Sequence, residues 1–211
     1  LSRRAAATGL FRFSVGIARL RTRRGTMSAV VQLVDVAPRD GLQNEATPVS
    51  TAEKLQLIAR LIEAGVRRIE VASFVNAQKV PQMADADAVC AGLPAARGVR
   101  YAGLVLNERG YERALATRRL HELCLVVCAS DSFGQRNQNQ TVAQGIAAVN
   151  AITRRARQDG LDSAITISVA FGCPFEGEVA VERVVEIAAA IAASEPSEIV
   201  LADTIGVAVP S

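Results

Sequence analysis

The sequence predicts an α/β fold in which buried parallel strands alternate with amphipathic helices. Short runs rich in β-branched and apolar residues recur along the chain, and stretches with the spacing of a helix separate them. Each run is almost continuously apolar, which is typical of parallel strands covered on both faces. Successive runs are separated by roughly the length of one strand–helix unit, the repeat of an α/β protein.

Six strands and five helices are expected from this pattern. The strands are expected at residues 30–36, 67–72, 99–105, 121–128, 164–171 and 198–203. The helices are expected at residues 51–64, 82–91, 108–117, 140–159 and 179–193. The first helix has the clearest signals, because Ser50 and Glu53 have the spacing of a capping box and Gly65 follows the last turn.

The arrangement of polar residues favours a barrel over an open sheet. An open doubly wound sheet usually has a glycine-rich phosphate turn after its first strand, and none is present here. Polar residues instead gather where the predicted strands end: Arg39 and Asp40, Glu70 and Ser73, Ser130 and Asp131, Cys173, Asp203 and Thr204. Such convergence is typical of the active-site end of a TIM (β/α)8 barrel. We therefore expect about six of the eight βα units of that barrel.

Composition excludes several classes of protein. The 211 residues are 50% hydrophobic and 21% charged with a mean hydropathy of +0.21, which excludes a disordered or fibrous chain. No apolar run approaches the roughly 20 residues of a membrane span, so no membrane partner is expected. Four cysteines in a chain of this length do not indicate a disulfide framework.

The positive charge is concentrated at the amino terminus. Of the 24 basic residues, seven arginines lie in residues 1–26, which contain no acid. The remainder holds 17 basic and 21 acidic residues, a net charge of −4. Because the basic residues lie outside the predicted fold, the sequence does not favour nucleic-acid binding.

Two interpretations of residues 1–26 remain open. An arginine-rich segment without acids is typical of a mitochondrial presequence, which would place the protein in the matrix. Alternatively Met27 is the true start, residues 1–26 are an upstream extension of the reading frame, and the protein is cytoplasmic. We favour the second interpretation, in which residues 27–211 form an incomplete barrel domain.

Three acidic positions are candidate site residues, each with a structural alternative. Asp40 follows the first strand, where a carboxylate suits a hard divalent cation, although Asp40 and Gly41 also fit a solvated turn. Glu70 interrupts an apolar strand, so it either serves a site or pairs with an arginine such as Arg39. Asp203 ends the sixth strand, where it also fits a helix N-cap.

The cysteines and the single histidine carry weaker signals. Cys124 and Cys128 lie on one face of a predicted strand, and without a second pair they favour buried thiols over a zinc site. Cys173 lies in a turn at a strand end and is a candidate pocket residue, whereas Cys90 falls in a helix. His121 precedes a strand, at the end of a barrel opposite to the usual active site.

Five segments, in family order, resemble the hydroxymethylglutaryl-CoA lyases, members of a metal-dependent superfamily of lyase and Claisen-condensing barrels. The matching segments are residues 34–45 (VDVAPRDGLQNE), 73–75 (SFV), 80–83 (VPQM), 172–177 (GCPFEG) and 202–206 (ADTIG). Residues 42–45 (LQNE) separate this branch from the related synthases, which usually have Glu-Gln at the first two of these positions.

The resemblance implies cleavage of (S)-3-hydroxy-3-methylglutaryl-CoA to acetyl-CoA and acetoacetate with Mg²⁺ or Mn²⁺, on an acyl-CoA substrate and in a homo-oligomer when full length. It implies that Asp40 is a metal ligand and that Arg39 neutralises the enolate. Glu70 and Asp203 would orient water or shuttle the proton. The resemblance assigns supporting roles to Gln43, Ser73 and Thr204, and places Ser130 and Cys173 near coenzyme A.

The chain departs from the family pattern at several points. Ala37 stands where the family usually has Gly, Asn76 and Ala77 replace Ser-Pro, and Asp131 replaces Glu. The family also has a His-x-His metal pair on the seventh strand and a glycine-rich cysteine loop after the eighth, whereas His121 is the only histidine here. We therefore expect a fragment of a longer product that is inactive alone. A Claisen-type synthase and a non-catalytic degenerate fragment are the alternatives.

Overall fold

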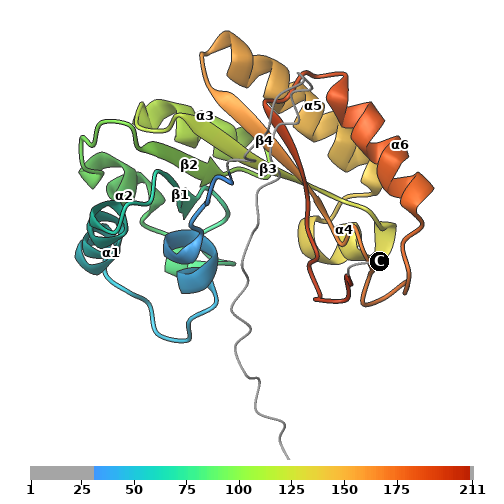
Figure 1. Cartoon of the computed structure of the whole chain (residues 1–211), viewed down its shortest axis with the longest axis horizontal. Helices are drawn as coiled ribbons and strands as arrows, with labels where there is room; N and C mark the ends of the chain where they lie inside the picture. The colour runs from blue at the N-terminus through green and yellow to red at the C-terminus, as the bar shows by residue number, and fades with distance from the viewer. Residues whose placement is uncertain (1–30, 210–211) are drawn as a thin grey trace, which may run out of the picture.

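A computed structural model of the chain describes residues 31–209, and in this range a five-stranded parallel sheet forms the centre of the molecule (Figure 1). The strands follow one another across the sheet in chain order: β1 (Arg68–Ser73), β2 (Arg100–Leu104), β3 (Glu122–Cys128), β4 (Asp162–Ser168) and β5 (Glu198–Leu201). All four pairings are parallel. The predicted leader, residues 1–26, and Met27 lie outside the described residues.

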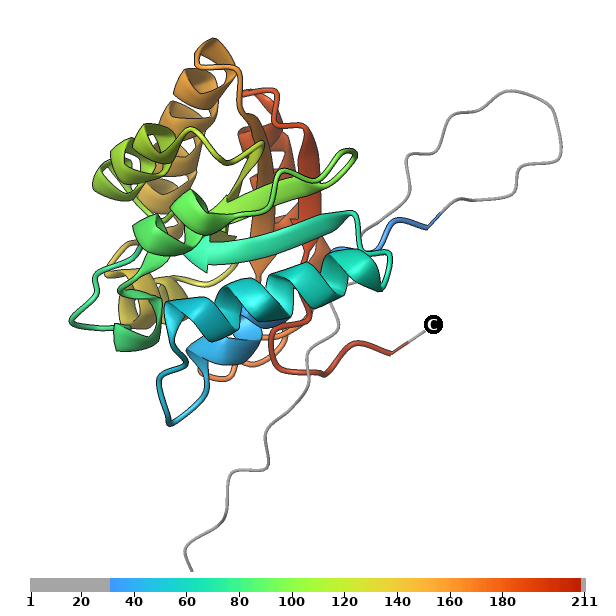
Figure 2. The same ribbon diagram turned by 90° about the vertical axis from the view of Figure 1, so that its left-hand side faces the viewer.

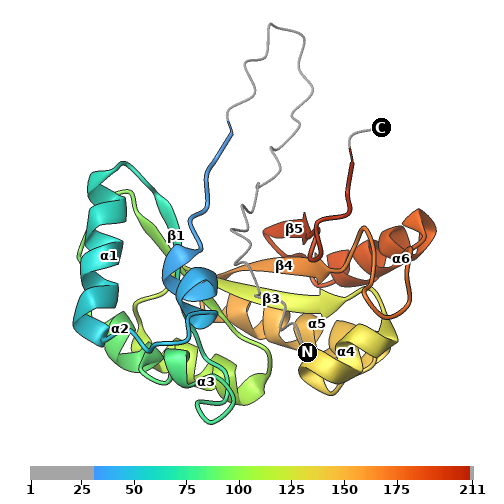
Figure 3. The ribbon, with the colours of Figure 1, turned by 90° about the horizontal axis from the view of Figure 1, so that it is seen from below.

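Six α-helices cover one face of the curved sheet, as Figure 3 shows from the end at which the strands finish. They are α1 (Thr51–Glu63), α2 (Ala86–Gly92), α3 (Glu108–Thr117), α4 (Asp131–Gln138), α5 (Val142–Gln158) and α6 (Val181–Ala192). In Figure 2 α1 lies nearest the viewer, running alongside the sheet. No helix within residues 31–209 is long and apolar enough to span a membrane. The prediction of an incomplete α/β barrel is confirmed.

The core lies between the helices and the outer face of the sheet. Alternate strand residues supply it, including Ile69, Leu125 and Ile165, and each is fully buried. The intervening residues point to the inner face, where Arg68 of β1 forms ion pairs with Glu122 of β3 and Glu198 of β5. One guanidinium therefore joins three strands across the inner face, near the ends at which the strands begin.

The first predicted strand, residues 30–36, is reduced within residues 31–36 to two isolated bridge residues, Leu33 and Asp35. Within the described part of the chain, only Asp35 is paired with β1, through a single parallel bridge to Ile69. The chain then turns, because the Val36 carbonyl accepts the N–H groups of Arg39, Asp40 and Gly41. These bonds begin a short π-helix, η1 (Ala37–Gly41). This turn ends the strand and moves the following side chains onto the sheet edge.

The helices differ from the predictions at two places. The helix predicted at residues 140–159 is present as α5, but α4, which precedes it at Asp131–Gln138, is not predicted by the sequence pattern because it has few apolar residues. The helix predicted at residues 82–91 begins later, because a 3₁₀ turn at Pro81–Met83 precedes α2. The capping box of Ser50 and Glu53 is confirmed, with both reciprocal bonds present.

Candidate active site

A partly buried arginine lies between two carboxylates, one of which is on β1. Arg39 Nε donates to Glu70 Oε1 at 2.6 Å, and Arg39 Nη1 donates to Asp40 Oδ1 at 2.7 Å. The Glu70 side chain is 6% exposed and that of Arg39 is 15% exposed. The Glu70 N–H donates to the Asp35 carbonyl, so the backbone itself holds the segment before η1 against β1. The predicted pairing of Glu70 with Arg39 is therefore present.

The charge of Arg39 is secured by its two partners. Burial alone lowers the pKa of Arg39, but the charge and hydrogen bond of Glu70 and the charge of Asp40 outweigh it and raise the pKa. Two of the five N–H groups of the guanidinium are used in these bonds. The rest make no hydrogen bond to another described residue, so they are available to an oxygen that carries or develops negative charge.

Two predicted site residues near this cluster in sequence have buried polar atoms without partners. Ser73, at the end of β1, is fully buried, and its Oγ has no hydrogen-bond partner among the described residues. Gln43 follows η1 by two residues, and its side-chain atom Oε1 is also buried without a hydrogen-bond partner among the described residues. An unsatisfied buried polar atom costs about 1–3 kcal/mol, so both positions are unusual unless a ligand or water supplies the missing bond.

Ser130 and Cys173 meet where β3 and β4 finish. Ser130 Oγ and Cys173 Sγ lie 2.9 Å apart, and both residues are buried. Ser130 also accepts the N–H of Phe133 as the N-cap of α4. The segment from Cys173 to Gly177 closes on itself through two backbone hydrogen bonds and packs on α4, where the rings of Phe133 and Phe175 lie 6.1 Å apart. No hydrogen bond between described residues joins this pair to Arg39.

A third polar group connects the ends of β4 and β5. Thr204 Oγ1 accepts the N–H of Val169 at 2.8 Å and lies 3.1 Å from Ser168 Oγ. Val169 is fully buried at a φ of 53°, which is an outlier for a β-branched residue. The Asp203 carboxylate accepts the N–H groups of Val207 and Ala208, so it organises the chain that follows. The sequence pattern gave no signal for the strained backbone at Val169.

The cysteines are thiols, and none lies in a metal cluster. Cys90, Cys124, Cys128 and Cys173 are free. Burial, together with the charges of Glu70 and Glu122, raises the pKa of Cys124, so this thiol stays protonated. Within residues 31–209, no group of three or more His, Cys, Asp or Glu side chains could hold a metal ion. Asp40 therefore lies in no such cluster, and His121 lies at the opposite end of the sheet, before β3.

Comparison with known proteins places this geometry in a family context. A family profile described as HMGL-like matches residues 30–211. The chain is 44% identical over 191 residues to (R)-citramalyl-CoA lyase of Chloroflexus aurantiacus, covering 86% of this chain and 60% of that protein. It is 38% identical over 200 residues to the mitochondrial hydroxymethylglutaryl-CoA lyase of Rattus norvegicus, covering 93% of this chain and 61% of that protein.

Solved structures give the same result. A crystal structure of the HMG-CoA lyase from Brucella melitensis matches with a TM-score of 0.81 at 40% identity, over 85% of this chain and 63% of that one. The structure of an HMG-CoA lyase from Acinetobacter baumannii in complex with coenzyme A and 3-methylmalate matches with a TM-score of 0.80 at 36% identity, over 84% and 57%. The chain thus spans about three fifths of the length of these relatives.

Proposed function

Because the chain belongs to the HMGL-like family, we propose that it supplies the arginine–carboxylate part of an acyl-CoA lyase that cleaves carbon–carbon bonds. We propose (S)-3-hydroxy-3-methylglutaryl-CoA as the substrate, with acetyl-CoA and acetoacetate as products. The single observation that carries this proposal is the partly buried Arg39, which is held by Glu70 and Asp40 and has further N–H groups without a partner among the described residues. The reaction needs such a cation, because bond cleavage leaves negative charge on the acetyl-CoA fragment.

The chemistry proceeds in three balanced steps. A base removes the proton of the C3 hydroxyl, the C2–C3 bond breaks as C3 becomes the ketone of acetoacetate, and the electron pair enters the acetyl-CoA enolate. A proton is then delivered to the enolate carbon. Arg39 acts in the second step, since its free N–H groups can donate to the enolate oxygen. Glu70 positions Arg39. Substitution of Glu70 is therefore expected to lower the rate of cleavage by displacing Arg39.

The remaining predicted residues are assigned roles that fit their environments. The Asp203 carboxylate accepts two backbone N–H groups, which fix its position, so it is suited to orient water or to shuttle the hydroxyl proton. Ser73, Gln43 and Thr204 would contact the acyl portion. Ser130 and Cys173 would lie toward coenzyme A, next to the wall formed by α4.

A divalent cation fits part of this site. The available donors are oxygens, namely the Asp40 carboxylate and the unpartnered buried Oε1 of Gln43, and Mg²⁺ and Mn²⁺ prefer oxygen ligands. When bound, the cation would polarise the substrate hydroxyl and lower its pKa. The described residues do not form a complete site, because no cluster of three ligand side chains is present in residues 31–209.

A related acyl-CoA is the second candidate substrate. The relative with 44% identity is a citramalyl-CoA lyase, whereas the HMG-CoA lyases cited above are 36–40% identical. Both reactions use the same retro-condensation chemistry, so Arg39 would serve either one. A Claisen-type synthase would run this chemistry in reverse, and its test is condensation of acetyl-CoA with a 2-oxo acid.

The test compares the 211-residue chain with the product of a reading frame extended beyond codon 211. We expect no acetoacetate from the chain with HMG-CoA and Mg²⁺, and turnover from an extended product that includes a His-x-His strand. The Arg39→Lys variant of the extended product is expected to lose at least a hundredfold in kcat, because Lys cannot keep both carboxylates and a free N–H fork. Turnover by the chain alone, or an active Arg39→Lys variant, would contradict the proposal.

A further inference from the structure

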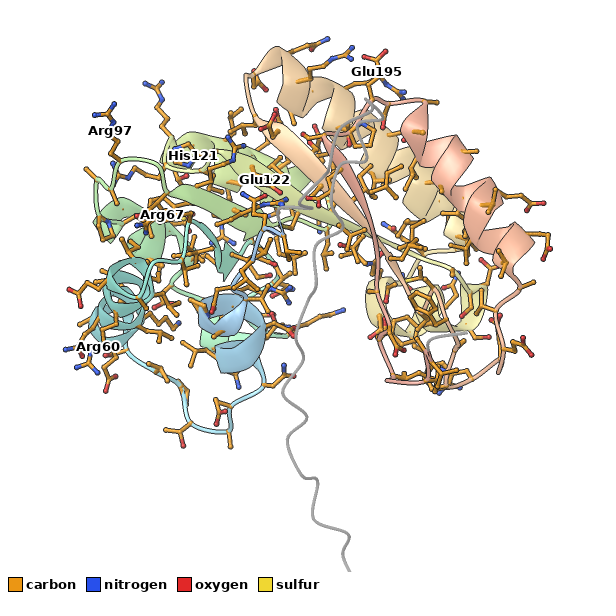
Figure 4. All side chains as sticks on the ribbon, viewed as in Figure 1. Arg60, Arg67, Arg97, His121, Glu122 and Glu195 are labelled. Carbon is orange, nitrogen blue, oxygen red and sulfur yellow. The ribbon has the colours of Figure 1, made fainter. Side chains whose placement is uncertain are left out.

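A polar surface cavity that is open to solvent lies at the end of the sheet opposite to the candidate active site. It has a volume of about 410 Å³ and is bounded by the connections that precede β2 and β3. Pockets for small organic ligands span roughly 300–1,000 Å³, so this one is large enough for a ligand. Figure 4 shows Arg97 and His121 on this side of the molecule, away from η1 and α4.

The cavity is strongly basic in a domain that is acidic elsewhere. Its eight lining residues include Arg97, Arg118, Arg119 and His121 and contain no acid. Residues 27–211 have a net charge of −4, so a cluster of three guanidinium groups is opposite in sign to the net charge of these residues. The nearby acids are already engaged, because Asp162 pairs with Arg100 and Glu122 pairs with Arg68.

Two of the cavity donors are held in place by the protein. Arg119 donates from Nε and Nη2 to the carbonyls of Cys90 and Leu93. The Nδ1 atom of His121 accepts the N–H of Tyr101 at 3.1 Å, which leaves the ring proton on Nε2 as a donor. Fixed donors of this kind lower the entropy cost of binding a ligand.

The other two cations, Arg97 and Arg118, are exposed and have no partner within residues 31–209. The side chains of Arg97 and Arg118 form no hydrogen bond or ion pair with any other residue in the described range. Arg118 also has a φ of 52°, a left-handed conformation at the end of α3 that usually belongs to glycine. Arg118 is exposed at the C-cap of α3, where a cation also interacts favourably with the carbonyl end of the helix dipole. Its guanidinium has no hydrogen-bond partner in the described range and is available to a ligand.

The remaining lining identifies the class of ligand. Pro94, Ala95 and Ala96 form an apolar wall beside the ring of Tyr101, whose hydroxyl is satisfied by the Pro94 carbonyl. We propose that this cavity binds a small organic phosphate of nucleotide size, with its phosphates on the arginines and its organic part against the wall. Guanidinium groups suit this role because they donate two parallel hydrogen bonds to phosphate oxygens.

Calorimetric titration of the 211-residue chain tests the proposal with ADP, pyrophosphate and adenosine as probes. We expect ADP to bind at least tenfold more tightly than adenosine, and its affinity to fall as salt rises from 50 to 500 mM. If pyrophosphate binds as tightly as ADP, the organic part of the ligand adds nothing to the affinity, and the proposed contact with the apolar wall is wrong. Absence of ADP binding at millimolar concentration would overturn it entirely.

Two variants assign any binding to this cavity. Arg97→Gln and Arg118→Gly are each expected to weaken ADP binding at least tenfold, the loss of one charged hydrogen-bond partner. Arg118→Gly also relieves the left-handed backbone, so its melting temperature should equal or exceed that of the original chain, which separates lost binding from lost folding. Arg60→Gln removes the same charge from the exposed side of α1 and should change the affinity less than twofold. Unchanged ADP binding in both cavity variants would place the ligand elsewhere.

Discussion

The ion pair between Glu70 and Arg39 should contribute measurably to the stability of the chain. The two groups lie 2.6 Å apart, and the Glu70 side chain is 6% exposed. Removing one partner of a fully buried pair costs about 3–5 kcal/mol. Arg39 retains Asp40 as a partner and is itself 15% exposed, so we expect Glu70→Ala to lower the free energy of unfolding by about 2–3 kcal/mol.

Urea unfolding followed by circular dichroism measures this change as a shift in midpoint at constant slope. Glu70→Gln is the matched control, because it retains an oxygen acceptor of the same shape and should lose only about 1 kcal/mol. A double-mutant cycle with Arg39→Gln isolates the pair from the packing of the Glu70 side chain. A cost below about 0.5 kcal/mol for Glu70→Ala, the range of ordinary surface substitutions, would refute the reasoning.

Three further predictions concern parts of the fold outside this pair. Thr204→Val removes the acceptor of the buried Val169 N–H and should cost about 1–3 kcal/mol in urea unfolding, whereas Thr204→Ser should cost less than 1 kcal/mol. Gly134→Ala should lower the melting temperature, instead of giving the usual helical gain of about 1 kcal/mol, because the new Cβ would lie 2.6 Å from the Gln140 carbonyl oxygen; an unchanged or raised melting temperature would show that the backbone yields. Burial, with a smaller effect of a nearby aspartate, raises the pKa of Cys90 from 9.0 to about 12. The unfolded chain therefore releases this proton first, so stability should fall as pH rises from 9 toward 12, by up to about 1.4 kcal/mol per pH unit, and Cys90→Ala should remove that part of the slope.

The sequence predicted most of the fold because apolar periodicity is a local property. Five of the six expected strands are present, and the capping box at Ser50 is present as expected. The failures occur where local signals are weak or ambiguous. Helix α4 is polar along most of its length, so apolar periodicity does not predict it. Its N-cap, Ser130, fits a polar site residue at the end of a strand equally well. The strand before η1 was overestimated, since a run of valines does not reveal where a backbone turn begins.

The candidate site was predictable in its residue types but not in its contacts. The cost of burying Glu70 was enough to suggest Arg39 as its partner, and the pair is present. The bond between Ser130 and Cys173 joins residues 43 positions apart, and no spacing rule predicts it. The left-handed backbone at Val169 lies in a segment whose composition is typical of a regular strand, so only the three-dimensional structure reveals it.

The two ends of the sheet differ in their buried charges and in their backbone conformation, and this difference bears on function. Where the strands begin, Arg68 binds Glu122 and Glu198 across three strands, so each buried charge there has a partner. Where the strands finish, the Ser73 hydroxyl lacks a partner among the described residues and Val169 has a strained backbone. Local rules are broken in native proteins mainly at functional sites, where a ligand recovers the cost. Substitutions in the Arg68 cluster should therefore alter stability with little effect on substrate binding, whereas substrate or coenzyme A should stabilise the end where the strands finish.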